Sequence, residues 1–217
     1  MKVIVSGLTA AGKTTLSEKL AHTLDVPYFS ASKILRDMLA DPADEWSEGL
    51  DQRRLDLGLE RAVDSTMIDL LHLHPSGIFD SWGLPWYSSE PALRIWIEST
   101  PASRLRKCYV SYLERNESKS FEECASILRS KDNLSRTVFQ ENWGFDIFKD
   151  RRPFNMIVDC SALIPDATVE HAKAGAQSTF ESVMDALVDR RLIAESHVHS
   201  FKDPLSSRLS PVIQWTA

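Results

Sequence analysis

The stretch GLTAAGKT, residues 7–14, decides the fold of this chain. It satisfies the pattern GxxxxGK[ST] and follows directly on the apolar, β-branched run Val3-Ile4-Val5. Leucines recur at every fourth position over residues 13–24, which predicts a helix immediately after the stretch. A glycine-rich loop between a strand and a helix turns several backbone N–H groups inward, and the helix N-terminus adds partial positive charge. The sequence therefore predicts a phosphate-binding loop.

The individual positions of this loop indicate a nucleotide and a metal ion as ligands. Lys13 would reach the β- and γ-phosphates, Thr14 would offer its hydroxyl to Mg²⁺, and Thr15 would touch the α-phosphate. ATP is the expected donor, although the loop itself does not separate ATP from GTP. The residues expected to bind the donor are Gly7, Ala10, Ala11, Gly12, Lys13, Thr14 and Thr15.

The composition restricts the class of protein. The chain has 217 residues, a formal net charge of −6 and 43% hydrophobic residues, which suits one main core. The negative charge argues against a nucleic-acid polymer as partner, and no apolar run approaches the ~20 residues of a membrane span. Cys108, Cys124 and Cys160 form no CxxC pair, which argues against a disulfide framework or a zinc site. We expect a cytoplasmic monomer or homodimer that acts on a small anionic molecule.

Short β-branched or aromatic runs alternate with longer stretches of helical period. This alternation is typical of a parallel sheet covered by helices, so we predict an α/β three-layer sandwich with a five-stranded parallel sheet. The expected strands are residues 2–6, 27–29, 77–81, 93–98 and 155–159. The expected helices are residues 13–24, 49–73, 102–116, 120–142 and 168–193.

The chain is interpreted as one domain over residues 1–190 followed by a tail. From residue 191 onward the composition changes to Ser, His, Pro and Arg without a clear period. Residues 191–217 are therefore expected to wrap the body or to lack regular structure.

Asp80 is a candidate catalytic residue because it follows the apolar residues 77–79 at the end of a predicted strand. In such sheets an acidic residue at this edge lies beside the phosphates, where it can support Mg²⁺ through water or orient an acceptor hydroxyl. A strand-ending Asp can also make a turn or cap a helix. We favour a catalytic role and leave open whether it acts as base or as metal support.

Arg129 and Arg136 are candidates for closing over the transferring group. They are separated by two helical turns and so share one face of a predicted helix. Phosphoryl transfer places charge on non-bridging oxygens, which arginines on a closing segment can stabilise. The alternative is an ordinary solvated helix face.

The segment VIVSGLTAAGKTTLSEKLAHTLDVPYFSASKILRDML, residues 3–39, resembles the P-loop nucleoside monophosphate kinases. The likeness is to the short, archaeal-like cytidylate kinase branch and covers roughly residues 2–160. It implies a P-loop kinase fold and transfer of the ATP γ-phosphate to a monophosphate, with an acceptor-binding region at about 31–75 and a lid at about 118–142. By the same resemblance the acceptor would be held by Ser32, Arg36, Arg53 and Arg54, and Arg129 and Arg136 match lid arginines.

The sequence departs from this family after the third predicted strand. The family has an acidic residue, Gly and Arg there, whereas this chain has Asp80-Ser81-Trp82 within FDSWGLPWY. Trp82 therefore replaces an arginine on the acceptor side, where an indole could stack on a base, shape an apolar pocket or belong to the core.

Three functions remain open at this stage. The first is a magnesium-dependent kinase of CMP, dCMP or a modified pyrimidine monophosphate. The second is a kinase of a non-nucleotide phosphate, phosphonate or alcohol, which the indole favours. The third is a nucleotide-binding regulatory protein that has lost transfer.

Overall fold

The computed structural model describes residues 1–39, 56–197 and 209–216. Its sheet contains β1 (Lys2–Gly7), β2 (Tyr28–Ser30), β3 (Gly77–Asp80), β4 (Leu93–Glu98), β5 (Met156–Asp159) and β6 (Val212–Trp215). The strands lie in the order β2-β3-β1-β4-β5-β6, and the first five of this row are parallel to their neighbours. The predicted α/β fold with five parallel strands is confirmed.

The strand order places β1 at a point where the chain's direction across the sheet reverses. Strands β3 and β2 lie on one side of β1, and β4 and β5 lie on the other. Ligands of open α/β sheets bind at such a switch point, outside the carboxyl ends of the strands. The loop that follows β1 is therefore in the position where a ligand is expected.

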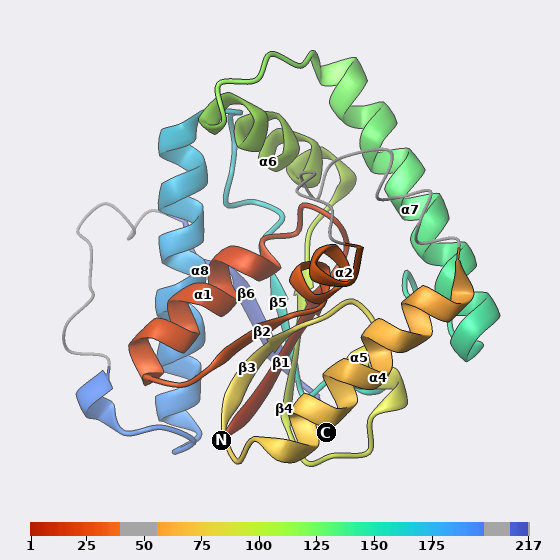
Figure 1. The fold of residues 1–217 in the computed structure, drawn as a ribbon. Coiled ribbons are helices and arrows are strands. Elements are labelled where there is room, and N and C mark those ends of the chain that lie inside the picture. The colour runs from red at the N-terminus through yellow and green to blue at the C-terminus, as the bar shows by residue number, and fades with distance from the viewer. Residues whose placement is uncertain (40–55, 198–208, 217) are drawn as a thin grey trace.

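One face of the sheet is covered by α1 (Lys13–Leu24) and α8 (Val169–Asp189), as Figure 1 shows. Alternate side chains of the central strand, Val3 and Val5, are fully buried against this layer. The helices contribute regularly spaced apolar residues, among them Leu16 and Leu20 of α1. Because β1 is buried on both faces, it is apolar at every position from Val3 to Val5.

The other face is covered by helices from the middle of the chain. Ile4 and Phe79 pack against α2 (Ala31–Leu39), α4 (Leu57–Leu73) and the short α5 (Leu84–Tyr87). The predicted helix 49–73 corresponds to α4, and residues 49–55 lie outside the described residues. No helix among residues 1–39, 56–197 and 209–216 is both long and apolar enough to cross a membrane.

Two further helices, α6 (Pro101–Glu114) and α7 (Phe121–Trp143), pack on each other above the carboxyl ends of the strands (Figure 1). Helix α7 begins with a capping box: Ser120 and Glu123 each accept a hydrogen bond from the other's backbone N–H. It ends at Gly144, whose φ of 69° is the left-handed conformation that glycine adopts easily. Local sequence signals therefore set both ends of this 23-residue helix.

The C-terminal tail differs from the prediction. A short 3₁₀ helix covers Glu195–His197, and β6 pairs antiparallel with β5 as a sixth strand of the sheet. The Arg190 guanidinium lies 4.7 Å from the centroid of the Trp215 ring, which ties the strand to the end of α8. The strand β6 has only four residues of alternating exposure. Such a short strand, next to a segment rich in Ser and Pro, shows no recognisable period in the sequence, so it was not predicted.

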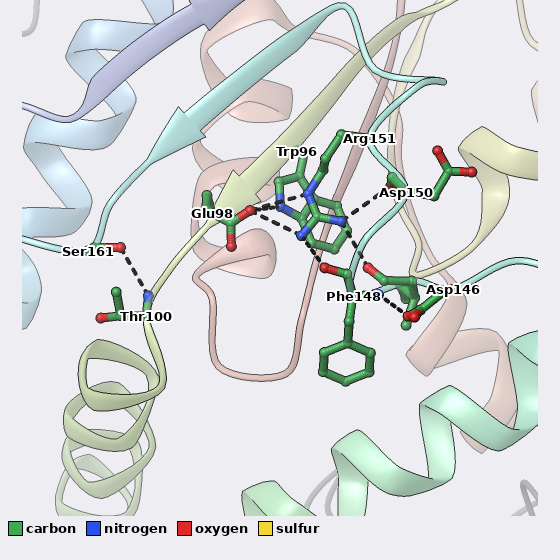
Figure 2. A network of polar contacts seen from close by, with 9 residues as sticks. Trp96, Glu98, Thr100, Asp146, Phe148, Asp150, Arg151 and Ser161 are labelled. Atoms are coloured by element: carbon green, nitrogen blue, oxygen red, sulfur yellow. Dashed lines mark hydrogen bonds and ion pairs between the residues drawn. The ribbon is translucent and has the colours of Figure 1, made fainter.

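The segment between α7 and β5 is held by Arg151, shown in Figure 2. Its Nε and Nη2 atoms donate to Glu98 Oε2 at 3.2 and 3.1 Å, and further N–H groups donate to the carbonyls of Ile147 and Phe148. The guanidinium also lies 3.8 Å from the centroid of the Trp96 ring. The planar guanidinium of Arg151 thus donates hydrogen bonds both to the Glu98 carboxylate and to the backbone carbonyls of the loop.

Replacement of Arg151 by Lys should lower the free energy of unfolding by about 2 kcal/mol, because an ammonium cannot reproduce the planar fork of donors. Urea titration followed by tryptophan fluorescence measures this change. Arg152→Lys is the matched control, since the side chain of Arg152 is 89% exposed. Equal effects of the two substitutions would contradict the proposed anchoring.

Candidate functional site

A cavity of about 440 Å³ lies beside the loop that follows β1. Its walls come from that loop, from the ends of β3 and β4, from α6 and α7, and from the first half of α8. Among the predicted site residues, those that line it are Ala10, Ala11, Gly12, Lys13, Thr14, Thr15, Ser32, Asp80 and Trp82. Three segments that are distant in sequence therefore meet at one site.

The loop has the shape of an anion cradle. Ala10 and Gly12 have φ angles of 59° and 109°, so the chain turns back on itself just before α1 begins. Among the described residues, no side chain caps the N-terminus of α1, which leaves its first N–H groups directed at the cavity. Gly7 does not line the cavity but is required beneath it, because a Cβ there would come within 2.8 Å of the Ile97 carbonyl oxygen.

The loop's carbonyl groups are held from outside by cations of α6. Lys107 Nζ donates to the Ala11 carbonyl at 2.8 Å, and Arg104 Nη1 donates to the Thr9 carbonyl at 3.2 Å. Lys13 Nζ donates to the Leu8 carbonyl at 3.2 Å. Binding of the carbonyls on one side leaves the amide N–H groups available on the other. Burial lowers the pKa of Lys107, which opposes its charge.

Thr14 and Asp80 form a hydroxyl–carboxylate pair at the floor of the cavity. Thr14 Oγ1 donates to Asp80 Oδ2 at 2.7 Å, and the Tyr28 hydroxyl donates to the same oxygen at 3.2 Å. Burial raises the pKa of the Asp80 carboxyl, while the Lys13 ammonium and the two hydroxyl donors oppose that shift. Hydroxyl and carboxylate oxygens are the ligand atoms that Mg²⁺ prefers, so the pair fits such an ion.

Next to Asp80, the described residues of α2 and of the turn after β3 that line the cavity are uncharged. They include Ser32, Ser81 and Trp82. The Ser6 hydroxyl donates to the Ser81 carbonyl at 2.6 Å, which fixes the turn after β3 against β1. Trp82 is partly buried and packs against the apolar residues under α4 and against the aromatic cluster under α7.

Behind this part of the cavity lies a buried polar network. Asp64 of α4 accepts hydrogen bonds from the Tyr87 hydroxyl and from Trp143 Nε1, the latter at 2.8 Å. The Tyr87 and Trp143 rings are stacked with centroids 4.3 Å apart. Burial is the main cause of a raised pKa at Tyr87, so its hydroxyl remains a donor. The network joins the end of α7 to α4 and α5.

The predicted arginines are distributed differently. Arg36 is half-buried on α2 and is not among the described residues lining the cavity, and Arg53 and Arg54 lie outside the described residues. Arg129 and Arg136 are exposed on α7, and Arg136 lies 4.2 Å from the centroid of the Phe148 ring. In this structure the two lid candidates are therefore not part of the cavity wall.

Sequence reasoning missed three lysines that line the cavity, Lys107, Lys131 and Lys173. Lys131 lies between the two arginines, and its signal was its register with Cys124 and Leu128 on the buried side of α7. No sequence pattern marks Lys107. Its contact with the Ala11 carbonyl depends on the direction of the loop's carbonyl groups, which only the tertiary structure shows.

No family model matches the chain. Similar curated proteins are archaeal cytidylate kinases. That of Pyrobaculum arsenaticum is 25% identical over 164 residues, which are 74% of this chain and 84% of that protein. That of Methanosarcina barkeri is 24% identical over 161 residues, covering 73% and 87% respectively. The Natronomonas pharaonis enzyme is 24% identical over 176 residues, covering 79% and 88%.

Solved structures of low sequence identity share the fold. Shikimate kinase from Acinetobacter baumannii, in complex with shikimate, superposes with a TM-score of 0.51 at 11% identity over 88% of this chain and 95% of that one. Shikimate kinase from Bacteroides thetaiotaomicron gives 0.50 at 14% identity, covering 85% and 98%. Together with the cytidylate kinase relatives, these likenesses support a phosphotransferase. The chain therefore has the three-layer fold of the P-loop kinases and resembles, within that group, the nucleoside monophosphate kinases of the cytidylate kinase branch.

Proposed function

We propose that this protein is an ATP-dependent kinase that transfers the γ-phosphate to a nucleoside monophosphate of the CMP or dCMP kind. The observation that carries the proposal is the contact of Thr14 Oγ1 with Asp80 Oδ2 at 2.7 Å, beside Lys13 and under the uncapped N-terminus of α1. The archaeal cytidylate kinases to which the chain is similar supply the acceptor class.

The donor side of the cavity suits a triphosphate. The loop's N–H groups and the N-terminus of α1 would hold phosphate oxygens, and Lys13 would place its ammonium beside the β- and γ-phosphates. Mg²⁺, when bound, would offset charge on these oxygens, and Thr14 and Asp80 are the residues that would support it. Catalysis would then rest on positioning and on charge stabilisation within a partly enclosed site.

The acceptor side gives the proposal its second candidate. A monophosphate carries about two negative charges that must be paired, yet α2 and the end of β3 with its following turn line the cavity with Ala31, Ser32, Asp80, Ser81 and Trp82, none of which is a cation. The cations for a nucleotide would be Arg36 and either Arg53 or Arg54. Because Trp82 stands where the resemblance predicts an arginine, a kinase acting on a non-nucleotide phosphate, phosphonate or alcohol is the second candidate.

An acceptor panel tests the two candidates. With Mg²⁺ and ATP, the purified protein should release ADP when given CMP or dCMP and much less when given UMP, AMP or shikimate. Lys13→Ala should lower this turnover by about 10³-fold or more, because a charge at the transferring group is lost. Turnover retained by Lys13→Ala would contradict the kinase assignment, and turnover with non-nucleotides alone would favour the second candidate.

Asp80 should carry opposing effects on activity and stability. Asp80→Asn should lower kcat about 10- to 100-fold, as expected for a group that supports a metal through water. Because burial raises the carboxyl's pKa in the folded state, Asp80 favours folding most below its unfolded pKa. This contribution is lost as pH rises through the folded pKa, so Asp80→Asn should be stabilising at pH 8 relative to wild type.

Urea unfolding of both proteins at pH 4 and pH 8 measures this difference. The stability gained by Asp80→Asn should be larger at pH 8, because there the wild-type chain must keep a buried carboxylate ionised. An asparagine oxygen can still accept from Thr14 and Tyr28, so the hydrogen bonds are retained. If the gain in stability is the same at pH 4 and pH 8, or is larger at pH 4, burial does not raise the pKa of the Asp80 carboxyl.

A further inference from the structure

Lys131 occupies a position of α7 where the pattern requires an apolar or small residue. The buried stripe of the helix consists of Cys124, Leu128, Lys131, Ser135, Val138 and Phe139. These positions recur at three and four residues, and the stripe faces α6 and the body of the protein. Lys131 is 5% exposed within it. A buried ammonium interacts with nearby negative charge more strongly than an exposed one does, because less water screens it.

Lys131 also borders the cavity, which it lines together with Lys13 and the residues of the phosphate loop. In the proposed reaction a triphosphate would bring its negative charge into this space, where a poorly hydrated ammonium interacts strongly with phosphate oxygens. Lys131 approaches from α7, whereas Lys13 approaches from α1. Two cations from separate elements therefore border the same space.

The residue after Lys131 holds this part of α7 against the loop. Asp132 accepts from Arg104 Nη1 and Nη2 at 2.8 and 2.6 Å, and Arg104 Nη1 also donates to the Thr9 carbonyl. The side chain of Arg104 is 6% exposed and that of Asp132 is 18% exposed, so the pair is shielded from solvent. A two-point guanidinium contact of this kind restricts the helix in both distance and orientation.

The neighbouring arginines do not have this placement. Arg129 and Arg136 lie off the buried stripe and are exposed, and Arg136 packs on Phe148. Both would need a movement of α7 to reach the loop, whereas Lys131 is at the cavity already.

We propose that Lys131 is a catalytic residue that contacts the γ-phosphate of the donor during transfer. This inference rests on the proposed function. In the step, the bond between γ-phosphorus and the β,γ-bridging oxygen breaks as an oxygen of the dianionic acceptor phosphate forms the new bond. ADP leaves with the electron pair, and no proton is transferred. Lys131 stabilises the charge on the non-bridging oxygens of the group in transit.

The test separates γ-phosphate contact from general nucleotide binding. Calorimetry with Mg²⁺ compares ADP with the non-hydrolysable triphosphate AMP-PNP, which differs from ADP by the terminal phosphate. Lys131→Met, which keeps the length of the chain without its charge, should weaken AMP-PNP about 10-fold while leaving ADP within about twofold. It should lower kcat with CMP about 100-fold or more. Lys131→Arg should restore part of both losses.

Matched substitutions make the result specific. Lys149→Met removes a lysine whose side chain is 86% exposed, and it should change neither affinity nor kcat. Arg129→Met and Arg136→Met test the rival assignment. If either of these lowers kcat more than Lys131→Met does, or if Lys131→Met weakens ADP and AMP-PNP equally, the inference is overturned. Lys131→Gln gives the same comparison with a polar side chain if the methionine variant does not fold.

Failure of the inference is distinguishable from failure of the proposed function. If the wild-type protein binds AMP-PNP and turns over CMP while Lys131→Met is unchanged, only the role of Lys131 is wrong. If the wild-type protein binds AMP-PNP but phosphorylates no monophosphate, the acceptor assignment fails, and the ADP to AMP-PNP comparison still decides whether Lys131 contacts the terminal phosphate. If the wild-type protein binds neither nucleotide, both the proposed function and the inference are wrong.

Discussion

The guanidinium of Arg104 is the contact on which the geometry of the cavity depends. It donates to the Thr9 carbonyl of the loop and, with two nitrogens, to the Asp132 carboxylate of α7. One buried side chain of α6 therefore joins the segment that would hold the phosphates to the helix that covers them. Removal of either partner would leave a shielded charge unpaired, which commonly costs about 3 to 5 kcal/mol. Preorganisation of the site is thus coupled directly to stability.

Helix α7 is attached at two places, once near its middle and once near its end. Near its end, Trp143 donates to Asp64 of α4 and stacks on Tyr87 of α5. Because a helix is stiff over this length, contacts near its middle and at its end orient it with respect to both halves of the cavity. A displacement of α4 would therefore move α7 and with it Lys131, which lines the cavity.

The fold was predictable because its determinants are local and periodic. The loop pattern placed α1 at Lys13–Leu24, and the apolar runs placed the five parallel strands within one or two residues. Strand β6 was missed because it is short and at an edge, and its pairing with β5 depends on the tertiary structure. Thr14, Asp80, Ser32 and Trp82, which were all singled out from the sequence, line one cavity. Lys131 could not be predicted from charge alone, because only its position on the buried stripe of α7 distinguishes it from the exposed Arg129 and Arg136.

The two sides of the cavity differ in how they can select a ligand. The cavity is lined by Lys13, Lys107, Lys131 and Lys173, together with Glu114, within a chain of net charge −6, so positive charge is concentrated there. The described acceptor side offers two hydroxyls and an indole. An indole favours binding of a flat or apolar group by excluding water from it, but it carries no positive charge to pair with a phosphate. Under the proposed function, charge recognition of the acceptor would fall to Arg36, Arg53 and Arg54, and Trp82 would discriminate by shape. A substitution at Trp82 should therefore change which acceptor is chosen more than whether a phosphate is transferred.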